Sequence, residues 1–138
     1  CASPHPELEL VRYVSRPFIF TASSSPATVA STRAALQQLR SRPELREAVW
    51  RNARQLYEGL QAAGFDLGPE VSPVIAVRQG QKENSVAFWN RLLEEGIYTN
   101  LMHPPATPDR NSYLRSSDSA AHSGEQIAQI VEAFGRLG

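Results

Sequence analysis

The chain has 138 residues, of which 41% are hydrophobic, and this size and composition fit one compact domain with a buried core. Its 14 basic residues balance its 14 acidic residues, which excludes a strong net field that would attract nucleic acid or an anionic membrane. The apolar runs are far shorter than the ~20 residues that cross a bilayer, and no signal peptide is evident, so a soluble, cytoplasmic chain is predicted. A single cysteine, Cys1, rules out an internal disulfide.

Two helices are predicted in the first half of the chain. The pair Ser25-Pro26 suits the cap and first turn of a helix that continues to Arg40. Ser41 and Glu44 have the spacing of a capping box for a second helix, which ends at Gly64. The apolar stripe of this second helix comprises Leu45, Val49, Leu56, Leu60 and Ala63.

A strand, a loop and a helix are predicted next. The run Val74–Val77 is short and rich in β-branched residues, which is typical of a buried strand. The segment with Lys82 is predicted to be a loop, because a charged side chain between a strand and a helix usually faces water. Asn84 is placed to cap a helix that runs through Glu95 and ends at Gly96.

Two further strands and a last helix complete the predicted order. Ile97–Thr99 and Tyr113–Ser116 are predicted strands, and the proline-rich segment 104–108 between them is predicted to be an ordered loop, because proline donates no ladder bond. Ser123 and Gln126 repeat the capping-box spacing and begin the final helix. The order helix-helix-strand-helix-strand-strand-helix predicts one layered α/β domain.

Two separated stretches of the sequence carry the strongest functional signal. The first, residues 16–23, reads Arg-Pro-Phe-Ile-Phe-Thr-Ala-Ser, and the second runs from His103-Pro-Pro-Ala-Thr-Pro to Leu114-Arg115. In that order and at that separation they resemble the C-terminal part of the α-oxoamine synthases. These are pyridoxal-phosphate (PLP) enzymes that join an amino acid to an acyl thioester, and within them the resemblance is strongest to the serine palmitoyltransferases. It covers nearly the whole chain.

The resemblance implies a particular fold, and it also implies that the lysine that holds the cofactor lies outside this chain. The fold is the small C-terminal domain of fold-type-I PLP-dependent transferases, an α/β domain with a short, mostly antiparallel sheet covered by helices. Residues 1–138 would form that domain, with residues 1–25 connecting it to a large PLP-binding domain outside the chain. The Schiff-base lysine is expected upstream, because the only lysine, Lys82, does not match its position. No catalytic residue is therefore assigned in this segment, and the chain alone is expected to be inactive.

The resemblance also implies four binding residues. Arg115 matches an arginine that holds the substrate carboxylate, and a guanidinium grips a carboxylate through two parallel hydrogen bonds. Thr21, Ala22 and Ser23 match residues that reach across a dimer to the cofactor phosphate of the other subunit. Hydroxyl groups just before a helix suit a phosphate, and they also suit helix capping, so both roles are open for this stretch.

Near Arg115, the positions His103 and Ser116 depart from the family pattern. His103 stands where an arginine usually precedes the paired prolines, and Ser116 replaces a cysteine that commonly follows the key arginine. A lone loop histidine is more often structural or solvated than catalytic, so His103 receives no catalytic role and no metal site is predicted. The exchange at Ser116 is expected to affect packing more than mechanism.

The implied activity is that of a PLP-dependent acyltransferase acting as a homodimer in sphingolipid biosynthesis. It would condense L-serine with a long-chain acyl-CoA, with loss of carbon dioxide, to 3-ketodihydrosphingosine. Two alternatives stay open. Another α-oxoamine synthase would make 8-amino-7-oxononanoate, 2-amino-3-ketobutyrate or 5-aminolevulinate. A noncatalytic partner subunit would keep the fold but would not need Arg115 or residues 21–23.

Overall fold

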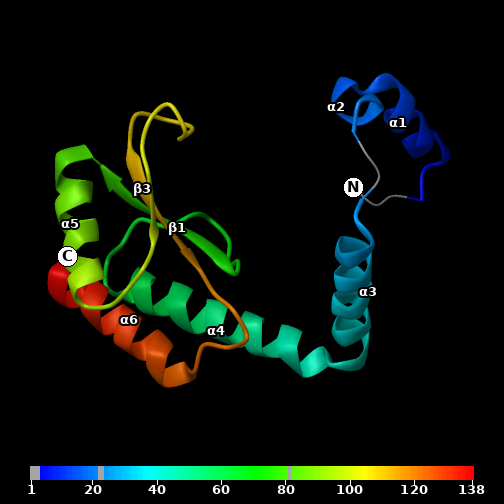
Figure 1. Cartoon of the computed structure of the whole chain (residues 1–138). Helices are drawn as coiled ribbons and strands as arrows, with labels where there is room; N and C mark the ends of the chain where they lie inside the picture. Colours follow the sequence, from blue (N-terminus) through cyan, green and yellow to red (C-terminus); the bar gives the residue numbers. More distant parts are fainter. Residues whose placement is uncertain (1–3, 22–23, 81) are drawn as a thin grey trace. The chain divides into compact units, whose positions relative to one another are not determined.

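The computed structural model of the chain describes residues 4–21, 24–80 and 82–138 (Figure 1). Backbone contacts divide it into two compact units, Cys1–Ser41 and Arg42–Gly138. The first unit is helical, and the second contains every strand of the described residues. The layered α/β arrangement predicted for the whole chain is therefore found in residues 42–138.

The first unit contains three short helical segments and one long helix. The short segments are the 3-10 helix η1 (Pro6–Leu10), α1 (Val11–Val14) and α2 (Arg16–Ile19), and the long helix is α3 (Pro26–Ser41). The predicted cap of α3 is confirmed, because the Thr28 amide donates to Ser25 Oγ at 3.2 Å. The short segments were not predicted, since segments of four or five residues are too brief for hydrophobic periodicity to show.

The second unit begins with α4 (Pro43–Ala62), and its predicted capping box is wrong. Ser41 is the last residue of α3, and its hydroxyl donates to the Gln38 carbonyl at 3.5 Å. The Glu44 carboxylate instead accepts from Arg42 Nε at 2.8 Å. Pro43 occupies the first turn, where its fixed φ starts a helix without a side-chain cap. The predicted end of α4 is confirmed, because Gly64 adopts the left-handed conformation with φ of +89°.

The three strands form one antiparallel sheet in the order β1-β3-β2. Their bounds are Val74–Gly80 for β1, Asn100–Met102 for β2 and Ser112–Ser117 for β3. The first and third predicted strands are confirmed, with β1 longer than expected. The fold class, a short antiparallel sheet covered by helices, is confirmed as well.

The predicted second strand, residues 97–99, is wrong because local bonds occupy that segment. The Ile97 amide donates to the Leu92 carbonyl at 2.8 Å, which closes the end of α5 (Lys82–Glu94). The Thr99 carbonyl accepts from Trp89 Nε1 at 2.8 Å instead of from a strand. Strand pairing therefore begins at Asn100.

Lys82 is also placed differently from the prediction, because it belongs to the first turn of α5 and not to a loop. Its carbonyl accepts from Ser85 Oγ at 2.7 Å. The strand β1 extends to Gly80, which has a positive φ of 72°, a conformation that glycine adopts readily. The predicted stop at Gly96, with φ of 78°, is confirmed.

The last helix, α6 (Gly124–Leu137), has the predicted capping box. Gln126 N donates to Ser123 Oγ at 3.2 Å, and Ser123 N donates to Gln126 Oε1 at 2.9 Å. α6 packs against α4 beside Gly59, where a Cβ atom would lie only 2.6 Å from Val131 Cγ2. A glycine at this position therefore lets the two helices approach closely.

The core lies between the sheet and the helices α4, α5 and α6, which surround it in Figure 1. Its buried members are Leu56, Leu60, Ile75, Val77, Phe88, Leu92, Leu114, Ile127 and Phe134. Along β1 and β3 buried residues alternate with more exposed ones. Since successive side chains of a strand point to opposite faces, the sheet has one covered face and one open face.

Candidate functional site

Arg115 lies in β3, the central strand, at the middle of the open face of the sheet. Its register partners are Ala76 in β1 and Asn100 in β2. The residues on either side of it, Leu114 and Ser116, are buried, whereas Arg115 is exposed. The alternation of the strand therefore directs this guanidinium away from the core.

Arg115 has no counter-ion among the residues that the structure describes. Within the described part of the chain its guanidinium makes no ion pair and no side-chain hydrogen bond. Arg78, on the same face, is by contrast paired with Asp66 at 3.3 Å and Asp109 at 3.7 Å. The planar fork of Arg115 is thus available to an external carboxylate or phosphate.

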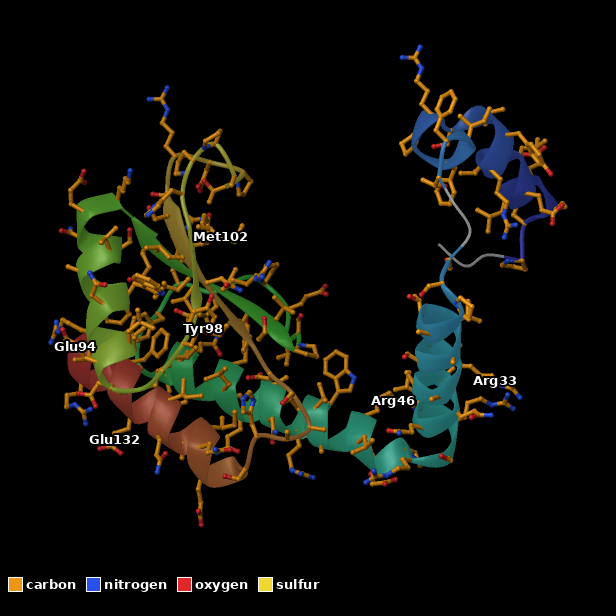
Figure 2. The ribbon with its side chains drawn as sticks, in the orientation of Figure 1. Arg33, Arg46, Glu94, Tyr98, Met102 and Glu132 are labelled. Atoms are coloured by element: carbon orange, nitrogen blue, oxygen red, sulfur yellow. The ribbon has the colours of Figure 1, made fainter. Side chains whose placement is uncertain are left out.

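The register neighbours of Arg115 on the open face are a small side chain and an amide. Ala76 contributes only a methyl group, and Asn100 contributes an amide whose Oδ1 accepts from the Tyr98 hydroxyl at 3.1 Å. The Nδ2 group of Asn100 makes no hydrogen bond among the described residues. Figure 2 labels Tyr98 and, at the end of β2, Met102, which pairs in register with Tyr113.

The loop between β2 and β3 contains a carboxylate that accepts several hydrogen bonds. Asp109 accepts hydrogen bonds of 2.9 Å from the Asn111 backbone, the Asn111 side chain and the Tyr113 hydroxyl. The bonds from Asn111 come first among the causes that lower the pKa of the Asp109 carboxyl, and Arg78 adds to them. Arg78 also stacks over the Tyr113 ring at 5.7 Å. This cluster fixes the loop that leads into β3 and was not predicted from the sequence.

His103 and Ser116, which were predicted to depart from the family pattern, lie near the two ends of β3 in different surroundings. His103 Nδ1 lies 2.7 Å from the hydroxyl of Ser112, which is buried at the start of β3. Ser116 is 6% exposed, and its hydroxyl has no hydrogen-bond partner among the described residues. Its side chain faces the helices, on the side of the sheet opposite to Arg115.

Thr21 is the one residue of the predicted phosphate stretch that the structure describes, because Ala22 and Ser23 lie outside the described residues. It is exposed, and its hydroxyl donates to the Phe18 carbonyl at 2.8 Å. A hydroxyl has a single hydrogen, so a bond to a phosphate requires this group to turn away from Phe18. Thr21 belongs to the first unit and Arg115 to the second.

The described ranges contain no group of three or more His, Cys, Asp or Glu side chains arranged to hold a metal ion. Across the same residues, none of the helices combines the length and the apolarity required to cross a bilayer.

Comparison with known proteins assigns the chain with this open, arginine-bearing sheet face to a family. The chain belongs to the aminotransferase class I and II family, whose sequence model matches residues 2–134. It is 46% identical over 138 residues to the serine palmitoyltransferase of Caulobacter vibrioides, covering 100% of this chain and 34% of that protein. It is 39% identical over 131 residues to the 2-amino-3-ketobutyrate coenzyme A ligase of Escherichia coli K12, covering 95% and 33%.

The chain is also similar to solved structures of serine palmitoyltransferases. The serine palmitoyltransferase of Sphingomonas wittichii matches with a TM-score of 0.87 at 41% identity, over 100% of this chain and 35% of that one. A variant serine palmitoyltransferase of S. paucimobilis with a bound PLP–myriocin aldimine matches with a TM-score of 0.89 at 41% identity, over 99% and 35%. The chain thus spans about a third of the length of these relatives, and the predicted resemblance is confirmed.

Proposed function

We propose that the chain is the C-terminal part of a PLP-dependent serine palmitoyltransferase. The complete enzyme would join L-serine to a long-chain acyl-CoA, releasing carbon dioxide and CoA, and form 3-ketodihydrosphingosine for sphingolipid biosynthesis. The observation that carries this proposal is the unpaired Arg115 at the centre of the open sheet face, in a chain 46% identical to a serine palmitoyltransferase. A cytoplasmic homodimer is part of the proposal, and the single cysteine is consistent with a reducing compartment.

Arg115 is proposed to bind the carboxylate of the amino-acid substrate. Two parallel N–H···O bonds would fix both the position and the plane of the carboxylate. Since the carboxylate is lost as carbon dioxide, its orientation decides which bond at the α carbon is aligned for reaction. Asn100, the register partner of Arg115, offers an amide donor beside it.

Thr21 is proposed to donate its hydroxyl hydrogen to the phosphate group of PLP. The cofactor, when bound, supplies an electron sink that stabilises negative charge at the α carbon of the substrate. Thr21 fits the phosphate as an exposed hydroxyl a few residues before the 16-residue helix α3. Ala22 and Ser23 are proposed to contribute to the same contact. Lys82, in the first turn of α5, is not proposed as the covalent anchor, which must come from outside the chain.

A substrate comparison on the complete enzyme tests the proposed function. With PLP present, CoA release and product mass are measured for L-serine or glycine combined with palmitoyl-CoA or acetyl-CoA. We expect kcat/KM for serine with palmitoyl-CoA to exceed that for glycine with acetyl-CoA at least tenfold, about 1.4 kcal/mol. The opposite preference would favour the 2-amino-3-ketobutyrate alternative, which the 39% identity to a ligase of that name supports. Absence of CoA release from any pair would favour a noncatalytic subunit.

Replacing Thr21 by valine in the complete enzyme is expected to weaken PLP binding about tenfold, because one hydrogen bond to a charged phosphate is lost. The measurement is a PLP titration followed by its absorbance. Thr32→Val is the matched control, since the Thr32 hydroxyl is also exposed and also donates to a local carbonyl, that of Thr28 at 2.9 Å. Equal PLP affinity in the Thr21 and Thr32 variants would remove Thr21 from the phosphate site.

A further inference from the structure

Two arginines are diagonal neighbours on the open face of the sheet. Arg78 in β1 pairs in register with Tyr113, and Arg115, two residues further along β3, pairs with Ala76. Arg78 and Arg115 both occupy exposed positions of strands in which buried and exposed residues alternate, so their side chains leave the same face. Diagonal neighbours of an antiparallel pair have Cβ atoms about 7 Å apart, which long side chains can span. One small ligand could therefore contact both guanidinium groups if both were free.

Only one of these two arginines is paired with carboxylates. Arg78 Nε lies 3.3 Å from Asp66 Oδ2, and Arg78 Nη2 lies 3.7 Å from Asp109 Oδ2. Arg115 makes no ion pair among the residues that the structure describes. The cluster of Arg78, Asp66 and Asp109 contains one positive and two negative groups, so it carries a net negative charge beside the free cation of Arg115.

Further contacts hold both aspartates and the guanidinium of Arg78 in this cluster. Asp109 accepts hydrogen bonds of 2.9 Å from the Asn111 backbone, the Asn111 side chain and the Tyr113 hydroxyl, and those from Asn111 are the main cause that lowers the pKa of its carboxyl. This carboxyl is therefore ionised at neutral pH. The Asp66 carbonyl accepts from the Arg78 amide at 2.9 Å, which brings Asp66 alongside β1. Arg78 also stacks over the Tyr113 ring at 5.7 Å, so a ligand carboxylate must compete with several contacts to reach it.

The charge of this cluster affects which ligands can bind at Arg115. A ligand with one carboxylate on Arg115 and a neutral side chain meets no opposing charge, because the register neighbours Ala76 and Asn100 are uncharged. A ligand with a second carboxylate brings that group near the negative cluster and is repelled. Water and salt screen groups as exposed as these, so the repulsion is a modest one. It is nevertheless specific, because it acts against one class of ligand and leaves the other unaffected.

We propose that Asp66 and Asp109 restrict the amino-acid site to substrates with a single carboxylate, because they neutralise Arg78 beside Arg115. This inference rests on the proposed function, in which Arg115 binds the carboxylate of the amino-acid substrate. The two aspartates determine specificity and touch no reacting atom. Without their negative charges, Arg78 and Arg115 would be two free cations on one face, an arrangement that favours a dicarboxylic amino acid.

The test compares the binding of L-aspartate and L-asparagine to the complete enzyme with PLP. These two amino acids have nearly the same size and differ in the charge of the side chain, and the absorbance change of bound PLP gives a Kd for each. In the original enzyme we expect aspartate to bind about tenfold more weakly than asparagine. In a double variant with Asp66→Asn and Asp109→Asn we expect this ratio of Kd values to fall about fivefold or more. Equal affinities in the original enzyme, or an unchanged ratio in the double variant, would overturn the proposal.

Two controls separate the role of Arg78 from the charge of the whole chain. Adding Arg78→Gln to the double variant is expected to reverse most of the fall in the ratio, because no second free guanidinium remains. Glu47→Gln with Glu58→Gln removes two exposed negative charges from α4, on the covered side of the sheet, and is expected to leave the ratio within about twofold. A fall that persists without Arg78, or an equal fall in the α4 variant, would contradict the proposal. Because the readout follows binding and not turnover, an enzyme that used another acyl-CoA would refute the proposed function and leave this test intact.

Discussion

Replacing Arg115 by alanine in the complete enzyme is expected to lower kcat/KM for the amino-acid substrate at least 100-fold, about 2.7 kcal/mol. The reason is the loss of the proposed bidentate, charge-assisted contact with the substrate carboxylate, since Arg115 is exposed on the open face and has no ion-pair partner among the described residues. Arg115→Lys keeps the charge but loses the planar fork. Its kcat/KM is therefore expected to lie between that of the original enzyme and that of Arg115→Ala. Steady-state kinetics at varied serine and fixed acyl-CoA measure both effects.

The matched control for this experiment is Arg110→Ala. Arg110 is an exposed arginine of the same β2–β3 loop and, like Arg115, makes no ion pair within the described residues. We expect its kcat/KM to stay within about twofold of the original enzyme, because an isolated solvated charge contributes little. Similar losses in the Arg110 and Arg115 variants would mean that general electrostatics, and not a specific contact, explains the effect. Thermal unfolding should not change for Arg115→Ala, since this side chain is exposed and unpartnered.

Local sequence signals predicted much of the second unit. The two predicted capping boxes show where such signals fail. Ser123 and Gln126 form a capping box in the structure, whereas Ser41 and Glu44 have the same spacing and do not. The difference is Pro43, whose fixed φ starts α4 one residue after Arg42 and leaves Ser41 in the preceding helix. A spacing rule alone does not show which of two competing starts a helix uses.

The position of β2 could not be predicted from the local sequence, again because contacts with other elements decide it. Residues 97–99 have strong β propensity, but Ile97 closes the end of α5 and the Thr99 carbonyl accepts from Trp89. These are contacts with a neighbouring helix, and propensity does not describe them. The same displacement places Thr99 opposite Ser116, and the hydroxyls of both residues are buried without a hydrogen-bond partner among the described residues.

The sequence predicted some residues of the candidate site and missed others. A motif identified Arg115, and the strand pattern then placed it on the open face, but its lack of an internal partner is visible only in three dimensions. The contacts among Arg78, Asp109 and Tyr113 join residues of two strands and a loop, and no spacing in the sequence indicates them. Thr21 remains a prediction from the motif alone, because the structure gives it only a local bond to Phe18.

Replacing Phe134 by alanine is expected to lower the free energy of unfolding of the chain by about 3–5 kcal/mol. Phe134 is 0% exposed, and its ring meets those of Phe65 at 5.5 Å and Phe88 at 5.6 Å, both in edge-to-face arrangements. The truncation removes apolar contacts and leaves a cavity between α6, α5 and the sheet, which a close-packed interior fills only in part. Urea denaturation followed by circular dichroism measures the loss.

Leu93→Ala provides the comparison for this loss, because Leu93 lies on α5 and is 36% exposed. Its substitution is expected to cost about 1 kcal/mol or less, since less apolar area returns to water and no closed cavity forms. The difference between the two variants isolates the aromatic cluster from the general effect of removing an apolar side chain. A Phe134→Ala cost no larger than that of Leu93→Ala would show that this cluster does not anchor α6. In that case the position of α6 would depend on its contacts with α4, where Gly59 lies against Val131.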